Sequence, residues 1–220
     1  LKMKIAVLGG SFNPIHIGHL ALADEICVSL GYDKVLFVPV FSPPHKNMNG
    51  ALSPEKRAKM VELACQDDPR FEIEPCEIQR GGISYTYDTV CFIEEKYKPE
   101  KIGLVIGRDL FSTFHLWNNA SLLVEKCELI LAERPFQTED KNFKNKATGK
   151  YSQADDCAEK EFWIEDEPLF KNAVFLKNEP LAVSSTSIRF RAANKMAFQY
   201  LVPSKVFKYI IDGNLYGSKN

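Results

Sequence analysis

A short apolar segment that ends in two glycines constrains the fold of this chain more than any other feature. Residues 4–8, Lys-Ile-Ala-Val-Leu, lead directly into Gly9 and Gly10. A continuous apolar run of this length is typical of a strand that is buried on both faces of a parallel sheet. Glycines at its end let the backbone approach a ligand, and the following helix presents its N-terminus at the same place. The start of the chain therefore predicts a buried strand with a ligand site at its carboxyl end.

Strands and helices alternate along the rest of the chain. Apolar residues recur at helical spacing over 19–30, and Gly31 predicts the end of that helix. Further strands are predicted at residues 35–39, 71–74, 102–106, 129–132 and 173–176, and further helices at 53–67, 86–97, 188–193 and 203–213. This order predicts an α/β fold, a doubly wound, Rossmann-like parallel sheet with helices on both faces.

The chain is expected to form one domain over residues 1–220, with one insertion and a C-terminal part. Residues 136–161 contain no Ile, Leu, Val or Met and many charged and amide side chains. This composition predicts a solvated surface insertion, although a surface for an unknown partner stays open as an alternative. Residues 183–220 are expected to supply a phosphate-binding motif and the last helices.

The charge and the cysteines exclude several classes of function. The formal net charge of -1 gives no overall basic field for a nucleic acid. The six cysteines are scattered without a C-x-x-C pair, which favours buried thiols in a reducing compartment over zinc or disulfides. No apolar run approaches the ~20 residues of a membrane span, and no signal peptide precedes the first strand. We therefore expect a cytoplasmic protein that binds neither membrane nor nucleic acid.

Two histidines follow the glycines at a spacing that suits phosphate. His16 and His19 flank Gly18 at the predicted start of the first helix, so both imidazoles can face one crevice. Their N–H groups can donate to phosphate oxygens. The dinucleotide pattern G-x-G-x-x-G does not fit, because Ser11 occupies its second glycine, and the P-loop pattern does not fit either.

A second anion site is predicted near the other end of the chain. Ser184, Ser185 and Thr186 stand where a helix should begin, and Arg189 follows one turn later. Hydroxyl and backbone N–H groups at a helix N-terminus bind anions, and a guanidinium adds further donors. In isolation, the three hydroxyl residues would indicate an ordinary N-cap.

The glycine–histidine segment resembles the signature of the H-x-G-H nucleotidyltransferases, and specifically of bacterial nicotinate-nucleotide adenylyltransferases. Residues 9–19 read Gly-Gly-Ser-Phe-Asn-Pro-Ile-His-Ile-Gly-His. Five further segments resemble that family in the same order, at residues 42–46, 84–89, 106–117, 183–189 and 201–216. Together they span nearly the whole chain apart from the insertion.

The resemblance implies adenylyl transfer from ATP to nicotinate mononucleotide, which gives nicotinate adenine dinucleotide and pyrophosphate in NAD biosynthesis. It implies a catalytic set that stabilises phosphate charge: His16, His19, Lys46 and Arg189. It implies an ATP-binding set: Gly9, Gly10, Ser11, Phe12, Gly18, Gly107, Asp109, Ser184, Ser185 and Thr186. It implies a set that binds the mononucleotide: Asn13, Tyr85, Thr86, Trp117 and Asn118.

Within these sets the resemblance gives particular positions particular roles. Asp109 would meet the adenosine ribose, although an acid at a helix N-terminus is the alternative. Trp117 would stack on the pyridine ring, although a core tryptophan is the alternative. The backbone N–H of Thr86 would meet the nicotinate carboxylate. His45 and Arg134 could also reach phosphate.

Three positions depart from the family pattern. Asn13 stands where an Asp is often found, and we expect the exchange to be tolerated. Arg108 replaces a small residue, where it could crowd the adenosine pocket or point to solvent. Asn118 stands where an aromatic residue is often found.

The expected cofactor is Mg²⁺, held by the phosphates of ATP and by water without dedicated protein ligands. ATP and nicotinate mononucleotide are the expected partners, and a homo-oligomer is possible. Two other functions stay open: a different H-x-G-H transferase, such as a phosphopantetheine adenylyltransferase or a cytidylyltransferase, and a nucleotide-binding regulator without catalysis.

Overall fold

The computed structural model describes residues 2–44, 48, 50–133, 150–152, 161–163 and 168–218. Lys46, His45 and Arg134 lie outside the described residues, as does most of the insertion. The predictions made for them therefore stay predictions.

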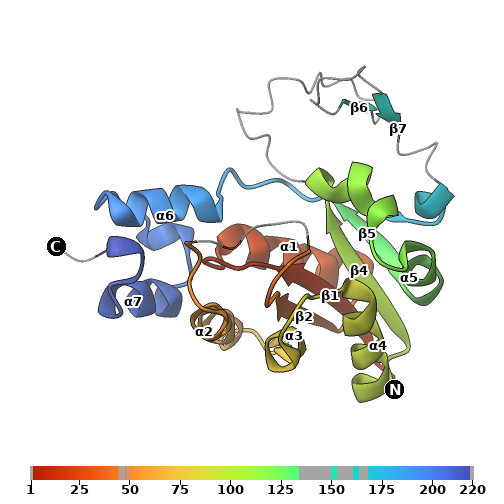
Figure 1. Ribbon diagram of the computed structural model, residues 1–220, viewed down its shortest axis with the longest axis horizontal. Helices are drawn as coiled ribbons and strands as arrows, with labels where there is room; N and C mark the ends of the chain where they lie inside the picture. The colour runs from red at the N-terminus through yellow and green to blue at the C-terminus, as the bar shows by residue number, and fades with distance from the viewer. Residues whose placement is uncertain are drawn as a thin grey trace.

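A six-stranded parallel sheet forms the centre of the molecule (Figure 1). Its strands are β1 (Lys4–Gly10), β2 (Lys34–Pro39), β3 (Phe71–Ile73), β4 (Lys101–Gly107), β5 (Glu128–Ala132) and β8 (Val174–Leu176). They lie in the order β3-β2-β1-β4-β5-β8, and every neighbouring pair is parallel. This is the doubly wound strand order, in which the direction of the winding reverses between β1 and β4.

Alternate residues of each strand face opposite sides of the sheet and build two hydrophobic cores. In β1, Ala6 and Leu8 belong to one core, while Ile5 and Val7 belong to the other. The first core is closed by helices α1 (Ile17–Leu30), α2 (Pro54–Cys65), α6 (Ser185–Ala193) and α7 (Ser204–Asp212). The second is closed by α3 (Cys76–Arg80), α4 (Thr86–Tyr97), α5 (Ala120–Lys126) and the 3₁₀ segment η1 (Arg108–Leu116). Helices on both faces explain why the strands read as unbroken apolar runs.

The predicted helices are present with small shifts at their ends. They are α1 (Ile17–Leu30), α2 (Pro54–Cys65), α4 (Thr86–Tyr97), α6 (Ser185–Ala193) and α7 (Ser204–Asp212). The side chain of Ser53 caps α2, whose last residue lies before the predicted end at 67. Figure 1 shows α6 and α7 together at the left of the view, beyond the sheet.

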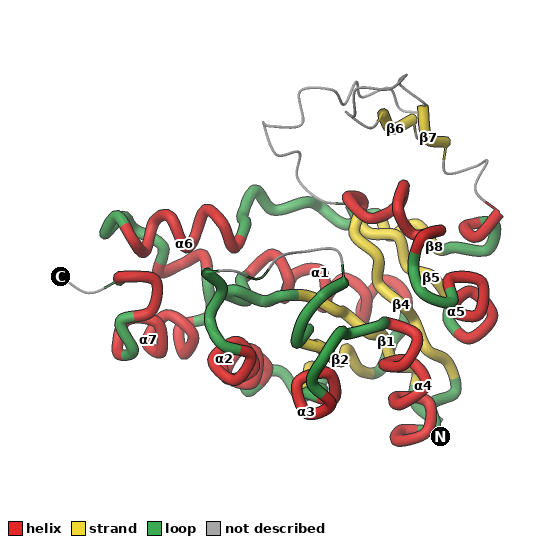
Figure 2. Tube along the Cα trace, viewed as in Figure 1, coloured by secondary structure: helices red, strands yellow, loops and turns green. Residues whose placement is uncertain are grey.

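Several short elements were not predicted. They are α3 (Cys76–Arg80), α5 (Ala120–Lys126), the 3₁₀ segments η1 (Arg108–Leu116), η3 (Pro168–Phe170), η4 (Gln199–Leu201) and η5 (Leu215–Gly217), and the strands β6 (Lys150–Ser152) and β7 (Glu161–Trp163). β6 and β7 pair antiparallel, so the predicted insertion contributes β6 to a two-stranded sheet whose other strand begins at the last residue of the insertion (Figure 2). Within the described ranges, no helix is long and apolar enough to cross a membrane.

The described cysteines behave as small apolar residues. Cys27, Cys65, Cys76 and Cys127 are buried free thiols, and Cys91 is partly buried. Burial raises the pKa of the thiols of Cys65, Cys76 and Cys127 to about 12, which keeps them protonated.

The sheet opens at the point where its winding reverses. The β1–β2 pairing continues to Gly10 and Pro39, whereas the β1–β4 pairing stops at Val7 and Leu104. β1 and β4 both run further, to Gly10 and Gly107. In open α/β sheets, ligands bind at this kind of opening, beyond the carboxyl ends of the strands.

Candidate active site

His16 and His19 lie together at the beginning of α1. His16 is the N-cap residue of α1 and is buried, and its ring stacks on that of His19 with 3.7 Å between centroids. The backbone N–H of His16 donates to Nδ1 of His19 over 3.2 Å. Because Nδ1 of His19 accepts this bond, the proton of the neutral ring lies on Nε2, which can donate to a ligand.

The need for glycine at position 18 follows from its neighbours. A Cβ there would lie 2.9 Å from Cγ1 of Val183 and 3.2 Å from two ring atoms of His16. Val183 immediately precedes the serine cluster of α6, so the first helix and the C-terminal segment touch at this glycine. Any larger residue would push the two predicted phosphate-binding segments apart.

Direct hydrogen bonds join the N-terminus of α6 to the loop after β1. The Ser185 hydroxyl donates to the carbonyl of Pro14 over 2.8 Å, and Nη1 of Arg189 donates to the carbonyl of Asn13 over 2.8 Å. Nη2 of Arg189 also donates to the Thr186 hydroxyl over 3.2 Å. A guanidinium has five N–H groups, so Arg189 keeps donors for an anion beyond these two contacts.

Ser184 performs the ordinary capping role that the sequence left open as the alternative. Its hydroxyl oxygen accepts a hydrogen bond from the backbone N–H of Ser187 over 3.1 Å. The O–H proton of Ser184 and the backbone N–H groups of the first turn of α6 can still donate to an anion.

The glycine loop itself is shaped by its packing. A Cβ on Gly9 would meet no atom within 4 Å, so the side of the loop at Gly9 is open. A Cβ on Gly10 would lie 3.1 Å from the ring of Phe12, which is buried beneath the loop. The Phe12 ring also meets His19 edge to face, with 5.1 Å between centroids. Phe12 therefore supports the loop and the histidine from inside the protein.

A buried arginine that the sequence analysis missed joins the loop after β1 to both ends of the loop between β2 and α2. Arg57 of α2 is 1% exposed and donates to the carbonyls of Ser11, Phe41 and Leu52 over 2.8, 3.3 and 3.2 Å. Burial lowers the pKa of its guanidinium, which nevertheless keeps its charge. The sequence signal was a charged residue on the apolar face of α2, spaced helically from Met60, Val61 and Ala64.

The side chain of Asn13 is engaged within the protein. Its Oδ1 accepts hydrogen bonds from the hydroxyl of Tyr216 over 2.7 Å and from the backbone N–H of Leu52 over 3.4 Å. Burial raises the pKa of the Tyr216 hydroxyl, which therefore stays a donor. In the structure, Asn13 thus ties the glycine loop to η5, in addition to the substrate-binding role that the resemblance implies.

Tyr85 and Thr86 stand at the N-terminus of α4, as N-cap and first residue. Both are partly buried. The preceding Ser84 is buried, its N–H donates to the carbonyl of Ser42, and its hydroxyl accepts from the N–H of Phe41 over 3.2 Å. The segment is therefore attached to the loop after β2.

The remaining predicted residues lie along η1, after β4. Gly107 is the N-cap residue of η1, Asp109 is an exposed residue in its first turn, and Asn118 is exposed just beyond its end. Trp117 is the C-cap residue of η1 and is partly buried. Its ring centroid lies 5.2 Å from that of Phe114. Trp117 therefore packs on the second core along part of its surface.

Of the two orientations expected for Arg108, the one toward solvent is wrong, and the crowding of an adenosine pocket stays a prediction. Its side chain is only 16% exposed, so it does not point into solvent. Nη1 lies 2.8 Å from a carboxylate oxygen of Glu133, which follows β5, so the guanidinium spans the ends of two neighbouring strands.

The donors at this crevice suit phosphate better than a metal ion. They are imidazole, hydroxyl, guanidinium and backbone N–H groups, whereas Mg²⁺ prefers oxygen ligands. No group of three or more His, Cys, Asp or Glu in the described part of the chain could hold a metal ion. These donors can bind the phosphates of a nucleotide that carries Mg²⁺, and Mg²⁺ itself stays a prediction.

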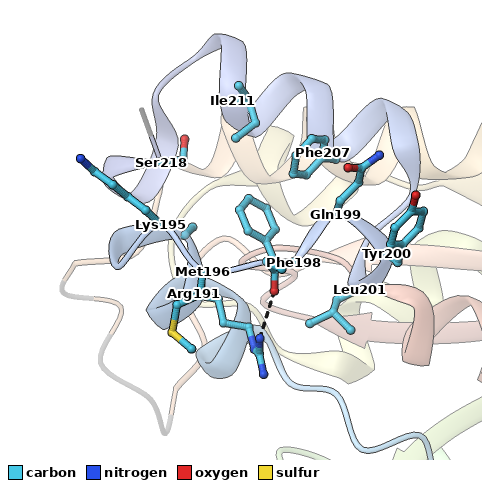
Figure 3. A pocket seen from close by; sticks show the side chains of 12 residues that line it. Arg191, Lys195, Met196, Phe198, Gln199, Tyr200, Leu201, Phe207, Ile211 and Ser218 are labelled. Carbon is cyan, nitrogen blue, oxygen red and sulfur yellow. Dashed lines mark hydrogen bonds between the residues drawn. The ribbon is translucent and has the colours of Figure 1, made fainter. Parts of the chain in front are cut away.

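A pocket of about 800 Å³ lies elsewhere, between α6, η4 and α7 (Figure 3). Its lining includes Met196, Phe198 and Tyr200, and Arg191 at its edge donates to the carbonyl of Ala197 over 3.0 Å. None of the predicted site residues that the structure describes lines it. The crevice at the end of β1 thus remains the candidate active site.

Comparison with known proteins identifies the family. A model of cytidylyltransferase-like proteins matches residues 7–191. A probable nicotinate-nucleotide adenylyltransferase of Borrelia garinii subsp. bavariensis is 37% identical, over 99% of this chain and 96% of the relative. A relative of the same name from Treponema pallidum is 37% identical, over 98% of this chain and 100% of the relative.

The chain belongs to the nicotinate-nucleotide adenylyltransferase family.

Solved structures agree with this family at the level of the fold. The Plasmodium falciparum nicotinic acid mononucleotide adenylyltransferase complexed with NaAD matches with a TM-score of 0.68 and 20% identity, over 98% of both chains. The same protein complexed with APC gives a TM-score of 0.67 and 19% identity, over 98% of both chains. The Rossmann-like fold and the family membership predicted from the motifs are confirmed.

In this member of the nicotinate-nucleotide adenylyltransferase family, two segments of the predicted site are in direct contact with each other. The loop of residues 9–19 and the start of α6 are joined by hydrogen bonds. The α4 segment and η1 lie at the ends of other elements, and the roles implied for Tyr85, Asp109 and Trp117 stay predictions.

Proposed function

We propose that the chain transfers the adenylyl group of ATP to nicotinate mononucleotide and releases pyrophosphate, forming nicotinate adenine dinucleotide for NAD biosynthesis. One observation carries the assignment to phosphate chemistry. Ser185 and Arg189 of α6 are bonded to the carbonyls of Pro14 and Asn13, so two anion-binding segments meet at the end of β1. The names of the relatives, at 37% identity over nearly the whole chain, support the choice of nucleotides.

The reaction is an in-line substitution at the α-phosphorus of ATP. A phosphate oxygen of the mononucleotide forms the new bond to this phosphorus, and the bond to the oxygen that bridges to the β-phosphorus breaks. Pyrophosphate leaves with the bonding electrons, and the attacking phosphate has no proton to lose when it is fully ionised. The protein mainly has to position two anions and stabilise charge.

His19 is the residue best placed to stabilise charge at the α-phosphate. Its Nδ1 is occupied by the backbone N–H of His16, which directs the remaining proton to Nε2. A donor that is already oriented needs no rearrangement when charge develops in the transition state. The stacked His16 ring holds His19 in place and supplies a second imidazole.

The β- and γ-phosphates are assigned to the N-terminus of α6. Backbone N–H groups of its first turn and the remaining donors of Arg189 would meet the leaving pyrophosphate. Gly9 leaves space for the nucleotide above the loop. Lys46, outside the described residues, is proposed to add a further positive charge.

The two nucleosides are assigned to the flanking elements. Asp109 would accept hydrogen bonds from the ribose of ATP, and the N-terminus of α4 at Thr86 would take the carboxylate of the pyridine ring. The exposed part of Trp117 would stack on that ring. When bound, Mg²⁺ on the triphosphate neutralises part of its charge.

Pyrophosphate release with ATP and Mg²⁺ tests the proposal. Nicotinate mononucleotide, nicotinamide mononucleotide and phosphopantetheine are offered in parallel as acceptors. We expect turnover with nicotinate mononucleotide, and much less with nicotinamide mononucleotide. Release only with phosphopantetheine would assign the chain to another H-x-G-H transferase. Nucleotide binding without release from any acceptor would indicate a regulator without catalysis.

A cytoplasmic location remains part of this proposal, and a homo-oligomer stays open. The buried thiols suit a reducing compartment. Fractionation of the native cell and the sedimentation velocity of the purified chain test these two points.

A further inference from the structure

A buried carboxylate beneath the N-terminus of α4 has no part in the chemistry described so far. Glu77 lies in α3 and is 7% exposed. The hydroxyl of Thr89 donates to its Oε1 over 2.6 Å, and Ser84 lies beside the same carboxyl group. Both hydroxyl residues are buried as well.

These two hydroxyls bracket the segment that is assigned to the mononucleotide. Ser84 immediately precedes Tyr85 and Thr86, and Thr89 lies in the first turn of α4 that these residues begin. One end of the segment is therefore bonded to Glu77 through Thr89, and the other end is bonded at Ser84 to the loop after β2.

The bond directions make Glu77 the last acceptor of a chain of donors through Thr89. Nη2 of Arg80 donates to the Thr89 hydroxyl over 3.4 Å, and Thr89 in turn donates to Glu77. Without Glu77, the Thr89 hydroxyl would keep only the carbonyl of Tyr85 as an acceptor, at 3.4 Å, and the loss of the shorter bond in a buried place is costly.

We infer that Glu77 is a positioning residue for recognition of the acceptor mononucleotide, because it sets the direction of the backbone N–H groups around Thr86. This inference rests on the proposed function. A helix N-terminus attracts a carboxylate only when its N–H groups converge on it, so a displaced segment loses affinity for the anion. The adenosine and triphosphate contacts lie on other elements and keep their geometry.

The pKa of the buried Glu77 carboxyl lies above its ordinary value. Burial raises the pKa of this carboxyl, while the hydroxyls of Thr89 and Ser84 beside it act in the opposite direction.

The chain offers a matched control at the other end of α4. Glu74 is 1% exposed, and its Oε2 accepts from Nζ of Lys96 and from the hydroxyl of Tyr97, both over 2.7 Å. Lys96 and Tyr97 are the last residues of α4. Substitution of Glu74 therefore disturbs the same helix through an equally buried carboxylate, far from Thr86.

The experiment compares Glu77→Ala, Glu77→Gln, Thr89→Val and Glu74→Gln with the parent enzyme. KM is measured for nicotinate mononucleotide and for ATP by pyrophosphate release, with thermal unfolding as the measure of stability. For Glu77→Ala we expect KM for the mononucleotide to rise about tenfold or more, which equals 1.4 kcal/mol per factor of ten, with KM for ATP within about twofold. The preference for nicotinate over nicotinamide mononucleotide should fall in parallel. Glu77→Gln should recover part of the loss, because its amide oxygen still accepts one bond.

Glu74→Gln should lower the melting temperature and leave both KM values within about twofold. Thr89→Val, which keeps the shape and removes one donor, should repeat the Glu77→Ala effect more weakly even if Glu77→Ala does not fold. Unchanged KM for the mononucleotide in the Glu77 and Thr89 variants contradicts the inference. Equal rises of KM for the mononucleotide and for ATP, in these variants and in Glu74→Gln alike, also contradict it. A parent enzyme that does not use nicotinate mononucleotide contradicts the proposed function and the inference together.

Discussion

A single backbone hydrogen bond determines what His19 can offer to a substrate. Because the N–H of His16 points at Nδ1, the ring must carry its proton on Nε2 while it is neutral. The bond also resists rotation of the ring, as does the edge of Phe12. Both effects prepare the imidazole as a donor before a nucleotide arrives.

We expect His19→Ala to lower kcat about 10²–10³-fold, the usual loss when one donor to a developing charge is removed. Pyrophosphate release measures the loss, and circular dichroism with thermal unfolding shows whether the fold persists. His115→Ala is the control, because His115 is an exposed histidine in η1. Activity of His19→Ala within about tenfold of the parent would show that the imidazole does not stabilise phosphate charge.

Two glycines of the same loop should respond differently to one added methyl group. Gly18→Ala forces the new Cβ against Val183 and the His16 ring, which overpacks the junction. We expect a loss of about 1–3 kcal/mol in the free energy of unfolding, together with reduced kcat. Gly9→Ala places its Cβ in open space, so stability should be kept while KM for ATP rises.

Urea unfolding and steady-state kinetics on both variants separate these effects. Equal free energies of unfolding for Gly18→Ala and Gly9→Ala would mean that the Val183 side chain moves aside at little cost. An unchanged KM for ATP in Gly9→Ala would mean that the nucleotide does not pass over this glycine.

Among the elements, α2 connects the loops around the crevice through one side chain. Arg57 donates to three backbone carbonyls at once. These carbonyls are the hydrogen-bond acceptors that the described contacts give its guanidinium. A planar guanidinium suits such divergent acceptors, whereas an ammonium is a compact point charge.

Arg57→Lys should therefore leave buried carbonyls without donors and lower the free energy of unfolding by about 1–3 kcal/mol. KM for ATP should rise as well, because the carbonyl of Ser11 belongs to the glycine loop. Urea unfolding and pyrophosphate release measure the two effects. Lys56→Met, at an exposed position of the same helix, should change neither the free energy of unfolding nor KM for ATP. A similar loss in both variants would contradict the role of Arg57 in joining the loops.

The main elements were predictable because their patterns are local. Unbroken apolar runs marked β1, β2, β4 and β5, and Ser53 with Pro54 marked the start of α2. η1 was missed because its helically spaced apolar residues, Leu110, Phe111 and Phe114, cover little more than one turn. α3 and α5 are too short for periodicity to show, and tertiary packing stabilises them.

At the scale of the whole molecule, residues distant in the sequence complete the glycine loop. Tyr216 of η5 donates to the side chain of Asn13, Arg189 donates to the carbonyl of Asn13, and Ser185 donates to the carbonyl of Pro14. Sequence motifs identified the loop and the start of α6 as partners in function. They could not identify the roles of Glu77 and Tyr216, because a buried hydrogen bond between distant residues leaves no local period, whereas Arg57 left a signal on the apolar face of α2.

Tyr216→Phe should weaken the attachment of η5 to the glycine loop by removing one hydrogen bond. This loss should lower the free energy of unfolding by about 0.5–1.5 kcal/mol. KM for ATP should rise slightly, since Asn13 belongs to the glycine loop. Thermal unfolding and kinetics check both, with Tyr200→Phe as a control at a tyrosine that is 84% exposed. Asn13→Asp keeps an acceptor for both donors and should be tolerated. A Tyr216→Phe variant as stable as the parent would show that the hydrogen bond to Asn13 does not hold η5 to the glycine loop.

The hydrogen bonds between the loop at residue 13 and residues 185, 189 and 216 also impose an order on synthesis. These pairs are separated by 171, 176 and 203 positions in the chain. A ribosome that adds about 5–20 residues per second needs roughly 10–40 s to make that distance. During this time the histidine loop exists without its partners, so the nascent chain acquires the ability to handle ATP only late, after most of its sheet has been translated.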